Sequence, residues 1–457
     1  MSSSNIKPIK LPYFTDSAKL FAPLAGKPWS VFLDSGAPKS QHGRFDILAA
    51  DPFCTLLTKG EITEISQNGL VNQSTEDPFF LLKQQLGENQ PGIKGLPFNG
   101  GAIGYFSYDL ARRLEQLPKI AKFSEKIPEM AVGIYRWAVI VDHKLKQTWL
   151  VGQEHSDLDW SKLQEQFSTI QNPPETDSFK VLADVTSNMS RETYAQAFSK
   201  VKYYLREGDC YQVNLSQRFS VQCSGSPWQA YLKLRELNAA PFGSYLNIPG
   251  VQVLSSSPER FLQVTGDFVE TRPIKGTRPR KKDPAENQRQ IDQLQQSEKD
   301  RAENVMIVDL LRNDLSKTCK VGSVKVPRLF AVESYATVHH LVSTVIGVLE
   351  KGRHALDILR SCFPGGSITG APKIRAMEII EELEPDRRGV YCGSIGYIGF
   401  DGNMDTNIAI RTMTYHQNKI YFSAGGGIVQ DSVLEEEYQE SFDKAAALIE
   451  VINQMKG

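Results

Sequence analysis

Short apolar runs rich in β-branched and aromatic residues recur along the chain, and polar or turn-forming residues separate them. Two of these runs, 131–141 and 147–151, flank the charged turn Asp142–Lys146, which predicts a β-hairpin. Further strands are predicted over 251–271, 391–400, 404–415 and 419–424. Meandering strands with helices between them are typical of an α+β fold with largely antiparallel sheets. A hydrophobic content of 40% fits a globular chain and excludes disorder, collagen and coiled coil.

Four helices are predicted between and after the strands. One begins after Ser190, a residue type that caps helix N-termini, and ends at Gly208. Two others are predicted from about Asp300 to Asp314 and from Pro372, since proline suits the first position of a helix. The last helix starts near Leu434, and its buried face is expected to comprise Tyr438, Phe442, Ala446 and Ile449.

Residues 211–221 alternate between apolar and polar side chains, which predicts a half-buried strand. Tyr211 and Val213 begin the apolar face. Gln212 and Asn214 begin a polar face that is available to a ligand.

A polar stretch over 154–189, which includes Pro173-Pro174, is the predicted boundary between two regions, 1–175 and 188–457. Charges are balanced, with 52 Lys and Arg against 53 Asp and Glu, so no nucleic-acid partner is expected. The six cysteines form no CxxC pair, no apolar run is long enough to span a membrane, and the amino terminus lacks the apolar segment of a signal peptide. We therefore expect a cytoplasmic protein without membrane contact.

Lys275 is a candidate nucleophile. It lies between a predicted strand and a turn, with Arg272, Arg278 and Arg280 close by in the sequence. Neighbouring cations and burial both lower the pKa of a lysine and so free its amine to attack a substrate. A surface lysine in a basic loop is the alternative, and the spacing alone favours it.

Glu259 is a candidate general acid. It follows Pro258, and the residues around a proline have a restricted backbone. A partly buried carboxyl with a raised pKa can donate a proton to a leaving group. The alternative is a structural glutamate that pairs with Arg260 or another arginine.

Three glutamates are candidate ligands of a metal ion. Glu303 lies near the start of one predicted helix, and Glu437 and Glu440 lie one turn apart on another. Carboxylates from two helices suit Mg²⁺, which prefers oxygen ligands and keeps part of its hydration shell. Solvated acidic helix faces are the alternative.

Gly425–Gly427 and Arg411 are candidates for binding carboxylate groups. Consecutive glycines let backbone N–H groups converge on an anion, and an arginine can hold a carboxylate with two hydrogen bonds. A flexible turn is the alternative for the glycines. Together with the lysine and the glutamates, these residues describe a site for a small polyanionic acid.

Longer segments carry a family resemblance: DRAENVMIVDLLRND over 300–314, GGSITGAPKIRAMEIIEELEP over 365–385, and GSIGYIGF followed by DTNIAIRT over 393–412. They resemble the chorismate-utilising enzymes, which include anthranilate synthase component I, aminodeoxychorismate synthase component I, and the isochorismate and salicylate synthases. The resemblance covers roughly 190–450 strongly. It implies two packed, largely antiparallel sheets flanked by helices.

Two positions discriminate within that family. Lys275 lies in PIKGT, where anthranilate synthases typically have PIAGT. Gln212 stands where isochorismate and salicylate synthases carry a lysine general base, and glutamine cannot deprotonate water. The resemblance therefore implies amination of chorismate to 4-amino-4-deoxychorismate, for 4-aminobenzoate and folate synthesis. Anthranilate synthesis is the runner-up.

The resemblance also implies roles for the matched residues. Lys275 would form a covalent intermediate, and Glu259 would protonate the departing hydroxyl group. Mg²⁺ would be held by Glu303 and Glu440, with Glu437 in or next to that shell. The residues expected to bind the substrate are Gln212, His340, Ser367, Tyr397, Arg411, Gly425, Gly426 and Gly427.

Partners follow from the same resemblance. The nucleophile pattern of triad glutaminases, G-x-C-x-G-x-Q, is absent around all six cysteines, so ammonia would come from solution or a separate glutaminase subunit. A pyridoxal-phosphate lyase would then convert the product to 4-aminobenzoate. The stretch Phe32–Ser35 matches the tryptophan-site motif of anthranilate synthases with Asp34 in place of glutamate, so Ser35 marks a candidate tryptophan site whose feedback role is doubtful. A non-catalytic module that binds tryptophan or chorismate is the alternative class, and the complete lysine and metal set speaks against it.

Overall fold

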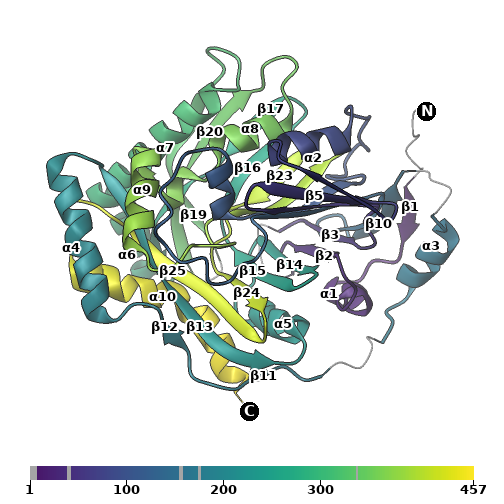
Figure 1. Cartoon of the computed structure of the whole chain (residues 1–457), viewed down its shortest axis with the longest axis horizontal. Helices are drawn as coiled ribbons and strands as arrows, with labels where there is room; N and C mark the ends of the chain where they lie inside the picture. Colours follow the sequence, from purple (N-terminus) through teal and green to yellow (C-terminus); the bar gives the residue numbers. More distant parts are fainter. Residues whose placement is uncertain (1–7, 39–42, 154–157, 173–176, 336–337, 457) are drawn as a thin grey trace.

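A computed structural model describes residues 8–38, 43–153, 158–172, 177–335 and 338–456. These residues form two large sheets with helices packed around them (Figure 1). The strands run antiparallel to their neighbours in both sheets. The predicted α+β class with two antiparallel sheets is confirmed.

The described part of the chain places thirteen strands in the first sheet. In spatial order they are β1 (Ile9–Leu11), β10 (Gln147–Gly152), β9 (Trp137–Asp142), β3 (Phe45–Ala49), β2 (Ser30–Asp34), β14 (Phe242–Ile248), β15 (Val251–Ser257), β24 (Thr412–His416), β25 (Lys419–Ile428), β13 (Gln212–Ser224) and β11 (Lys180–Val181), while β12 (Thr186–Ser187) and β21 (Gly370–Ala371) also pair with β13.

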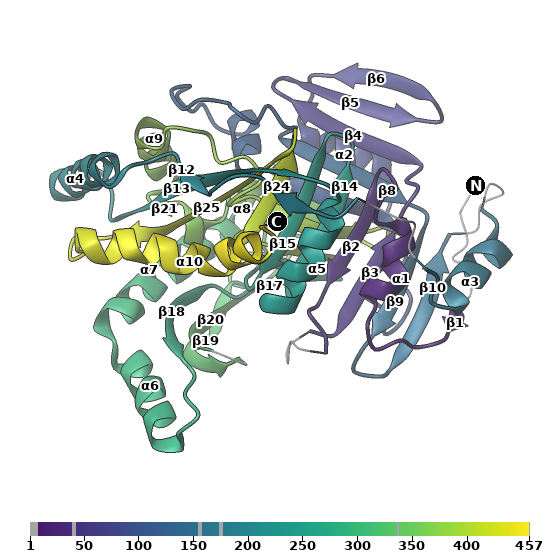
Figure 2. The ribbon, with the colours of Figure 1, turned by 90° about the horizontal axis from the view of Figure 1, so that it is seen from below.

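The second sheet contains twelve strands within the same described ranges. Their spatial order is β18 (Ile274–Pro279), β20 (Val338–Val348), β17 (Phe268–Thr271), β16 (Arg260–Thr265), β23 (Met404–Asn407), β22 (Ser394–Gly399), β7 (Gly101–Phe106), β8 (Met130–Tyr135), β4 (Cys54–Lys59), β5 (Ile62–Gln67) and β6 (Leu70–Ser74), while β19 (Lys325–Ser334) also pairs with β20. The hairpin β5–β6 lies at an outer edge of the molecule (Figure 2).

Helices cover the outer faces of the two sheets. The α-helices are α1 (Ala18–Phe21), α2 (Pro78–Leu86), α3 (Trp160–Ser168), α4 (Arg191–Glu207), α5 (Pro227–Leu237), α6 (Pro284–Gln296), α7 (Glu298–Ser316), α8 (Ala355–Cys362), α9 (Lys373–Leu383) and α10 (Leu434–Gln454). Three short 3₁₀ helices are η1 (Ala22–Leu24), η2 (Tyr108–Arg113) and η3 (Gly366–Ile368). No helix within the described ranges is long and apolar enough to cross a membrane.

The two sequence regions on either side of the polar stretch share both sheets. β2 from the amino-terminal region pairs with β14, and β7 pairs with β22. The regions 1–175 and 188–457 therefore contribute strands to the same two sheets. The boundary between them stays a prediction. Both sheets also share a core, because Val31 and Val253 of the first sheet pack in one buried cluster with Ile103 and Ile395 of the second.

Two predicted strands are each divided between the sheets. The run 131–141 forms β8 in the second sheet and β9 in the first, with Arg136 between them. The run 404–415 likewise forms β23 and β24, with 408–411 between them. A continuous apolar run indicates burial but not the point at which the chain passes from one sheet to the other. The hairpin β9–β10, however, is confirmed.

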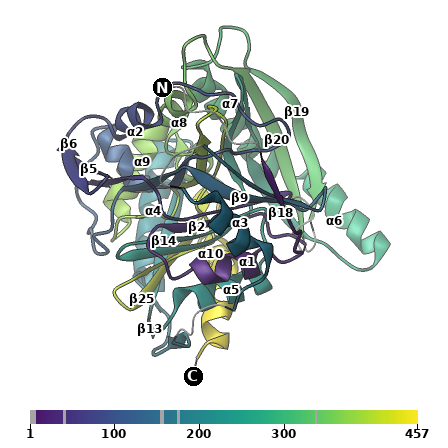
Figure 3. The same ribbon diagram turned by 90° about the vertical axis from the view of Figure 1, so that its right-hand side faces the viewer.

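The predicted helix ends are confirmed where their capping chemistry is local. The Ser190 hydroxyl accepts a hydrogen bond from the backbone N–H of Thr193, and Gly208 ends α4 in the left-handed conformation with φ of 79°. Pro372, by contrast, precedes α9 as its N-cap instead of occupying its first turn. The helix α6 was not predicted, and it projects from the body of the molecule (Figures 2 and 3).

The predicted buried face of α10 is wrong by one residue. The helix buries Glu437, Ser441, Ala445 and Leu448, whereas Ala446 is exposed and Tyr438, Phe442 and Ile449 are only half-buried. The apolar spacing could not reveal this rotation, because two of the inward-facing residues, Glu437 and Ser441, are polar.

Candidate active site

A cavity of about 740 Å³ lies between the two sheets and the helices α7 and α10. Strands β13 and β25 form its wall on the side of the first sheet, and β18 and β20 form its wall on the side of the second. Ten residues of the predicted site line it: Glu259, Lys275, Glu303, His340, Ser367, Arg411, Gly425, Gly427, Glu437 and Glu440. Segments that are far apart in the sequence are thus brought to one place.

Lys275 lies on β18, where the ladder to β20 is interrupted. The register shifts between Lys275 and Thr277, and Gly276 is the extra residue, with φ of 76°. A Cβ atom at Gly276 would lie 2.9 Å from the Asp300 carboxyl carbon, so only glycine fits this bulge. Burial lowers the pKa of Lys275, and the nearby Lys444 lowers it further, although Glu303 acts in the opposite direction. The local environment therefore favours the neutral amine.

Glu259 lies between β15 and β16 and faces the same cavity. Burial raises the pKa of its carboxyl to about 7, against the opposing effects of a hydrogen bond from Ser367 and the charge of Lys275. Ser367 connects the two groups, because its backbone carbonyl also accepts a hydrogen bond of 3.4 Å from Lys275 Nζ. Lys275 and Glu259 therefore both contact Ser367. The environment shifts the amine toward its neutral form and the carboxyl toward its protonated form.

His340 and Arg411 form another part of the wall. The Nδ1 atom of His340 shares a hydrogen bond of 2.9 Å with the Thr277 hydroxyl. Burial and the charge of Arg411 lower the pKa of His340 to about 4, so its imidazole is neutral around pH 7. Arg411 is the last residue of the break between β23 and β24, with φ of 51°, and it forms no ion pair with a carboxylate of the described residues. Its guanidinium is thus available to an anionic ligand.

The three glutamates line one side of the cavity from α7 and α10. Burial raises the pKa of Glu303 and of Glu437. Glu440 differs: burial would raise its pKa, but Lys444, whose Nζ lies 2.6 Å from Glu440 Oε1, lowers it overall. As they stand, no three histidine, cysteine or carboxylate side chains of the described chain are close enough together to hold a metal ion.

The donor set nevertheless fits Mg²⁺ in its chemistry. The Oε2 atom of Glu437 is buried and has no hydrogen-bond partner among the described residues. A Cβ atom at Gly426 would lie 2.7 Å from this oxygen and 3.5 Å from Glu440 Oε1, so the glycine leaves room beside both carboxylates. Carboxylate oxygens in this arrangement are the ligands that a hard cation prefers. The magnesium site stays a prediction.

Sequence reasoning missed Lys444 and Tyr391 among the residues of the cavity wall. Lys444 lies on α10 one turn after Glu440, and its Nζ also donates to the Gly425 carbonyl at 2.9 Å. The helical spacing of four residues from a candidate ligand was the available signal. Tyr391 also lines the cavity. No spacing pattern in the sequence distinguishes Tyr391 from Tyr397, because both tyrosines lie in the same segment rich in aromatic residues and glycine.

Tyr397 and Gln212 are not brought to the cavity surface. Tyr397 lines a different cavity, whereas Tyr391 lines the cavity that contains Lys275 and Glu259. Gln212 is completely buried beside Gly427, which does line the cavity. The sequence alternation correctly placed Gln212 and Asn214 on one face of β13, and only Asn214 reaches the cavity.

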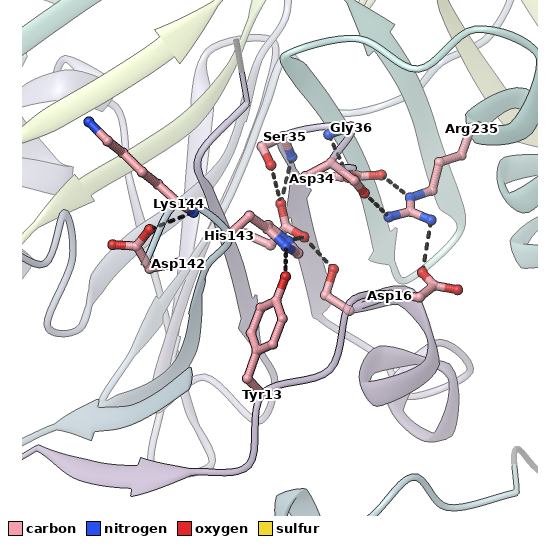
Figure 4. A network of polar contacts seen from close by, with 12 residues as sticks. Tyr13, Asp16, Asp34, Ser35, Gly36, Asp142, His143, Lys144 and Arg235 are labelled. Carbon is pink, nitrogen blue, oxygen red and sulfur yellow. Dashed lines mark hydrogen bonds and ion pairs between the residues drawn. The ribbon is translucent and has the colours of Figure 1, made fainter. Parts of the chain in front are cut away.

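A second cavity of about 430 Å³ contains Ser35 and Tyr397. Ser35 is held by Asp46, which accepts hydrogen bonds from its backbone N–H at 2.8 Å and its hydroxyl at 2.6 Å. The neighbouring Asp34 accepts a hydrogen bond of 2.6 Å from Arg235 Nε, and Figure 4 shows these groups in one polar network. Arg260 lines the second cavity, and its sequence neighbour Glu259 lines the first.

Comparison with known proteins is consistent with this arrangement. The family model described as "chorismate binding enzyme" matches residues 31–450. The chain is 50% identical to aminodeoxychorismate synthase component 1 of Escherichia coli over 96% of this chain and 97% of that one, and 38% identical to anthranilate synthase component 1 of Aquifex aeolicus over 93% and 89%. The crystal structure of anthranilate synthase component I from Streptococcus pneumoniae is similar, with a TM-score of 0.77, 32% identity and coverage of 89% and 92%.

Proposed function

The chain belongs to the chorismate binding enzyme family, and on that premise we propose that it converts chorismate and ammonia into 4-amino-4-deoxychorismate. The main support for the proposal is that Lys275 and Glu259 line one cavity and that each forms a hydrogen bond with Ser367. A lysine nucleophile and a carboxylic acid are the two groups needed to replace a poor leaving group in two steps.

In the first step, the neutral amine of Lys275 adds to ring carbon 2. A carbon–nitrogen bond forms, the two ring double bonds shift, and the bond from carbon 4 to its hydroxyl oxygen breaks. Glu259 gives its proton to that oxygen, which leaves as water. This order requires an amine without a proton and a carboxyl with one, and burial biases both groups in that direction.

In the second step, ammonia adds to carbon 4 on the same ring. The double bonds return, the bond between carbon 2 and the Lys275 nitrogen breaks, and the incoming nitrogen gives up one proton. Lys275 is released as an amine, and the Glu259 carboxylate left by the first step is the acceptor for that proton. Arg411 and the backbone N–H groups near Gly425 and Gly427 would bind and orient the substrate carboxylates.

Glu303 and Glu440, with Glu437 in or next to the shell, would hold Mg²⁺. When bound, the ion would supply positive charge for the ring carboxylate of chorismate. Replacement of Glu303 by glutamine keeps the shape and removes a charged oxygen ligand. We expect Mg²⁺ affinity, measured by titration calorimetry, to fall by about tenfold or more. Equal affinity in Glu303→Gln and the parent would remove the ligand role; Glu298→Gln, on the exposed start of the same helix, is the matched control.

Ammonia is proposed to come from a separate glutaminase component, as the name "component 1" of the relatives suggests. All six cysteines are buried and free, and burial raises the pKa of every one of these thiols, to about 11 in Cys54 and Cys210, which favours the unreactive protonated form. Buried free thiols also support the expected reducing compartment, the cytoplasm. A pyridoxal-phosphate lyase would consume the product.

L-Tryptophan is the proposed ligand of the second cavity, at Ser35. Ligand binding to the folded state raises the melting temperature, so we expect L-tryptophan to raise it and D-tryptophan not to. Because Asp34 is already engaged by Arg235, we expect little change in turnover. A melting temperature that responds equally to both enantiomers would argue against a specific site.

The product identifies the branch of the family. The purified chain with chorismate, ammonium and Mg²⁺ should form a species that a lyase converts to 4-aminobenzoate. Release of anthranilate and pyruvate would instead support the runner-up, anthranilate synthase component I, to which the chain is also similar.

A further inference from the structure

A buried ion pair lies directly behind the cavity wall. Arg388, in the segment between α9 and β22, pairs with Glu384 at the end of α9, and their side chains are only 2% and 5% exposed. Two hydrogen bonds join them, from Arg388 Nε at 2.9 Å and from Nη2 at 2.7 Å. Neither residue lines the cavity, and the proposed chemistry uses neither charge. Because taking two charges out of water is costly, the other contacts of the pair indicate what it holds in place.

Two further hydrogen bonds connect Arg388 to the cavity wall. Its Nη1 atom donates to the carbonyl of Ile368 at 2.8 Å, and its Nη2 atom donates to the carbonyl of Asn214 at 2.7 Å. Ile368 ends η3 and Asn214 lies on β13, and both line the cavity. One guanidinium therefore holds two separate backbone segments of the wall. Its planar set of five N–H donors allows this, whereas the compact ammonium of a lysine does not.

The strand β13 is attached to the same ion pair at a second point. It begins at the surface, because Tyr211, which the alternation wrongly placed on its apolar face, precedes it and is 73% exposed. Further along, the backbone N–H and the hydroxyl of Ser216 donate to Glu384 Oε1 at 2.9 Å and 2.7 Å. Between these points, the backbone N–H of Asn214 donates to the Thr369 carbonyl at 2.8 Å. The strand, η3 and the ion pair are thus fixed to one another.

The segment that Arg388 holds contains the serine in contact with both catalytic groups. Ser367 precedes Ile368 in η3. Its carbonyl accepts the hydrogen bond of 3.4 Å from Lys275 Nζ, and its side chain forms the hydrogen bond with Glu259. A displacement of η3 would therefore move the partners of the amine and of the carboxyl together. Reaction rates are sensitive to such placement, since a shift of about 1 Å can slow a reaction about a hundredfold.

We propose that Arg388 is a positioning residue: paired with Glu384, it holds η3 against β13 so that Ser367 keeps the nucleophile and the acid in their reacting places. This proposal rests on the proposed function, because it names what holds the two groups of that reaction. Arg388 lies behind the wall and touches neither the substrate nor the reacting atoms. A change at Arg388 is therefore expected to slow the chemical steps more than it weakens chorismate binding.

The test is the Arg388→Lys variant of the full chain, assayed with chorismate, ammonium chloride and Mg²⁺. Lysine keeps a positive charge beside Glu384 but cannot reach both backbone carbonyls and both carboxylate oxygens at once. We expect kcat to fall by about ten- to a hundredfold, while the KM for chorismate changes by less than about threefold. Arg112→Lys is the matched control and should leave kcat nearly unchanged, because Arg112 pairs with the buried Glu381 on the same helix and does not line the cavity.

The pH profile of kcat separates positioning from a simple loss of stability. Burial raises the pKa of Glu259 to about 7, and the hydrogen bond from Ser367 opposes that rise. Loss of this hydrogen bond should raise the pKa further and move the falling limb of the profile to higher pH. Partial unfolding alone would lower the amount of active enzyme and leave the limb in place. The other charged or titratable groups that act on Glu259, none of which the substitution changes, are Lys275, Lys444, Arg411 and Cys392.

The outcomes separate the two proposals. If the parent chain forms no aminated product from chorismate and ammonium, the proposed function fails, whatever Arg388 does. If the parent forms it and Arg388→Lys keeps the parent kcat, or loses activity while the falling limb stays at the parent pH, the positioning role is overturned. Should the lysine variant not fold, the double variant Arg388→Met with Glu384→Gln removes both charges together, so that neither is left buried without its partner. The same expectations and the same contradicting results apply to it.

Discussion

Replacement of Lys275 by alanine is expected to lower the rate of aminodeoxychorismate formation by about three orders of magnitude or more, the size of effect seen when a covalent nucleophile is removed. Its amine lies in the cavity, and burial lowers its pKa. Lys299 and Lys444 of the same wall are paired with Glu437 and Glu440, so they are not expected to take over the attack. Formation of the product is measured by coupling to the lyase.

Chorismate binding should survive in the Lys275→Ala variant. Arg411 and the glycines of β25 are the proposed contacts for the substrate carboxylates, and they are unaffected by the change. Titration calorimetry measures this affinity directly. The matched control is Lys282→Ala, an exposed lysine that follows β18 in the same basic stretch. If the Lys275→Ala enzyme turns over as fast as the parent, Lys275 is not the nucleophile. The alternative, a lysine of the basic loop without a catalytic role, would then be supported.

Replacement of Glu259 by glutamine is expected to slow the reaction by roughly 10²- to 10⁴-fold, the usual contribution of a general acid. Glutamine keeps the shape of the side chain but has no acidic proton for the leaving hydroxyl. Consumption of chorismate before ammonia is added is the appropriate measurement, since the acid acts in that step. A matched control is Glu270→Gln, which alters a carboxylate that is paired with Arg260 and does not line the cavity.

The same carboxyl predicts a pH dependence. Burial raises the pKa of Glu259 to about 7, so the carboxyl is protonated below that pH and loses its proton above it. The acid form is the active one, and ionisation of Glu259 should therefore lower the rate of the first step as the pH rises. Lys275 contributes the opposite slope, because it must be deprotonated, and burial lowers the pKa at which it loses its proton. Glu259→Gln should lack the falling limb; a parent profile that keeps rising through the alkaline range would contradict the acid role.

Local signals in the sequence predicted much of the secondary structure. Ser190 and Gly208 fix the ends of α4 through chemistry that depends only on nearby residues. The β16–β17 hairpin turns at Gly266 and Asp267, within the predicted strand region. The passage of 404–415 from one sheet to the other was not predictable, because it depends on which distant strands receive β23 and β24. That passage is also what brings Arg411 to the cavity.

The candidate site shows the same division. Lys275, Glu259 and the glutamates were predicted from residue type, spacing and the family resemblance, and the fold brings them to one cavity. Tyr397 was predicted at the substrate, but β22 carries it toward the second cavity, and Tyr391, which precedes the strand, lines the first. Lys444 was not predicted, because the glutamates before it on α10, Glu435–Glu437 and Glu440, were considered only as metal ligands or as a solvated acidic face. Side-chain direction at these positions depends on packing that only the three-dimensional structure supplies.

The most direct measurement for the account is the mass of the intact chain after it is mixed with chorismate and Mg²⁺ without ammonia and then rapidly quenched. We predict a covalent adduct whose mass corresponds to chorismate minus water, which peptide mapping places on Lys275, and which disappears when ammonium is added before the quench. The Lys275→Ala variant should form none. Aminated product without any adduct in the parent, or an adduct on another residue, would contradict the central claim that Lys275 attacks the ring and ammonia then displaces it.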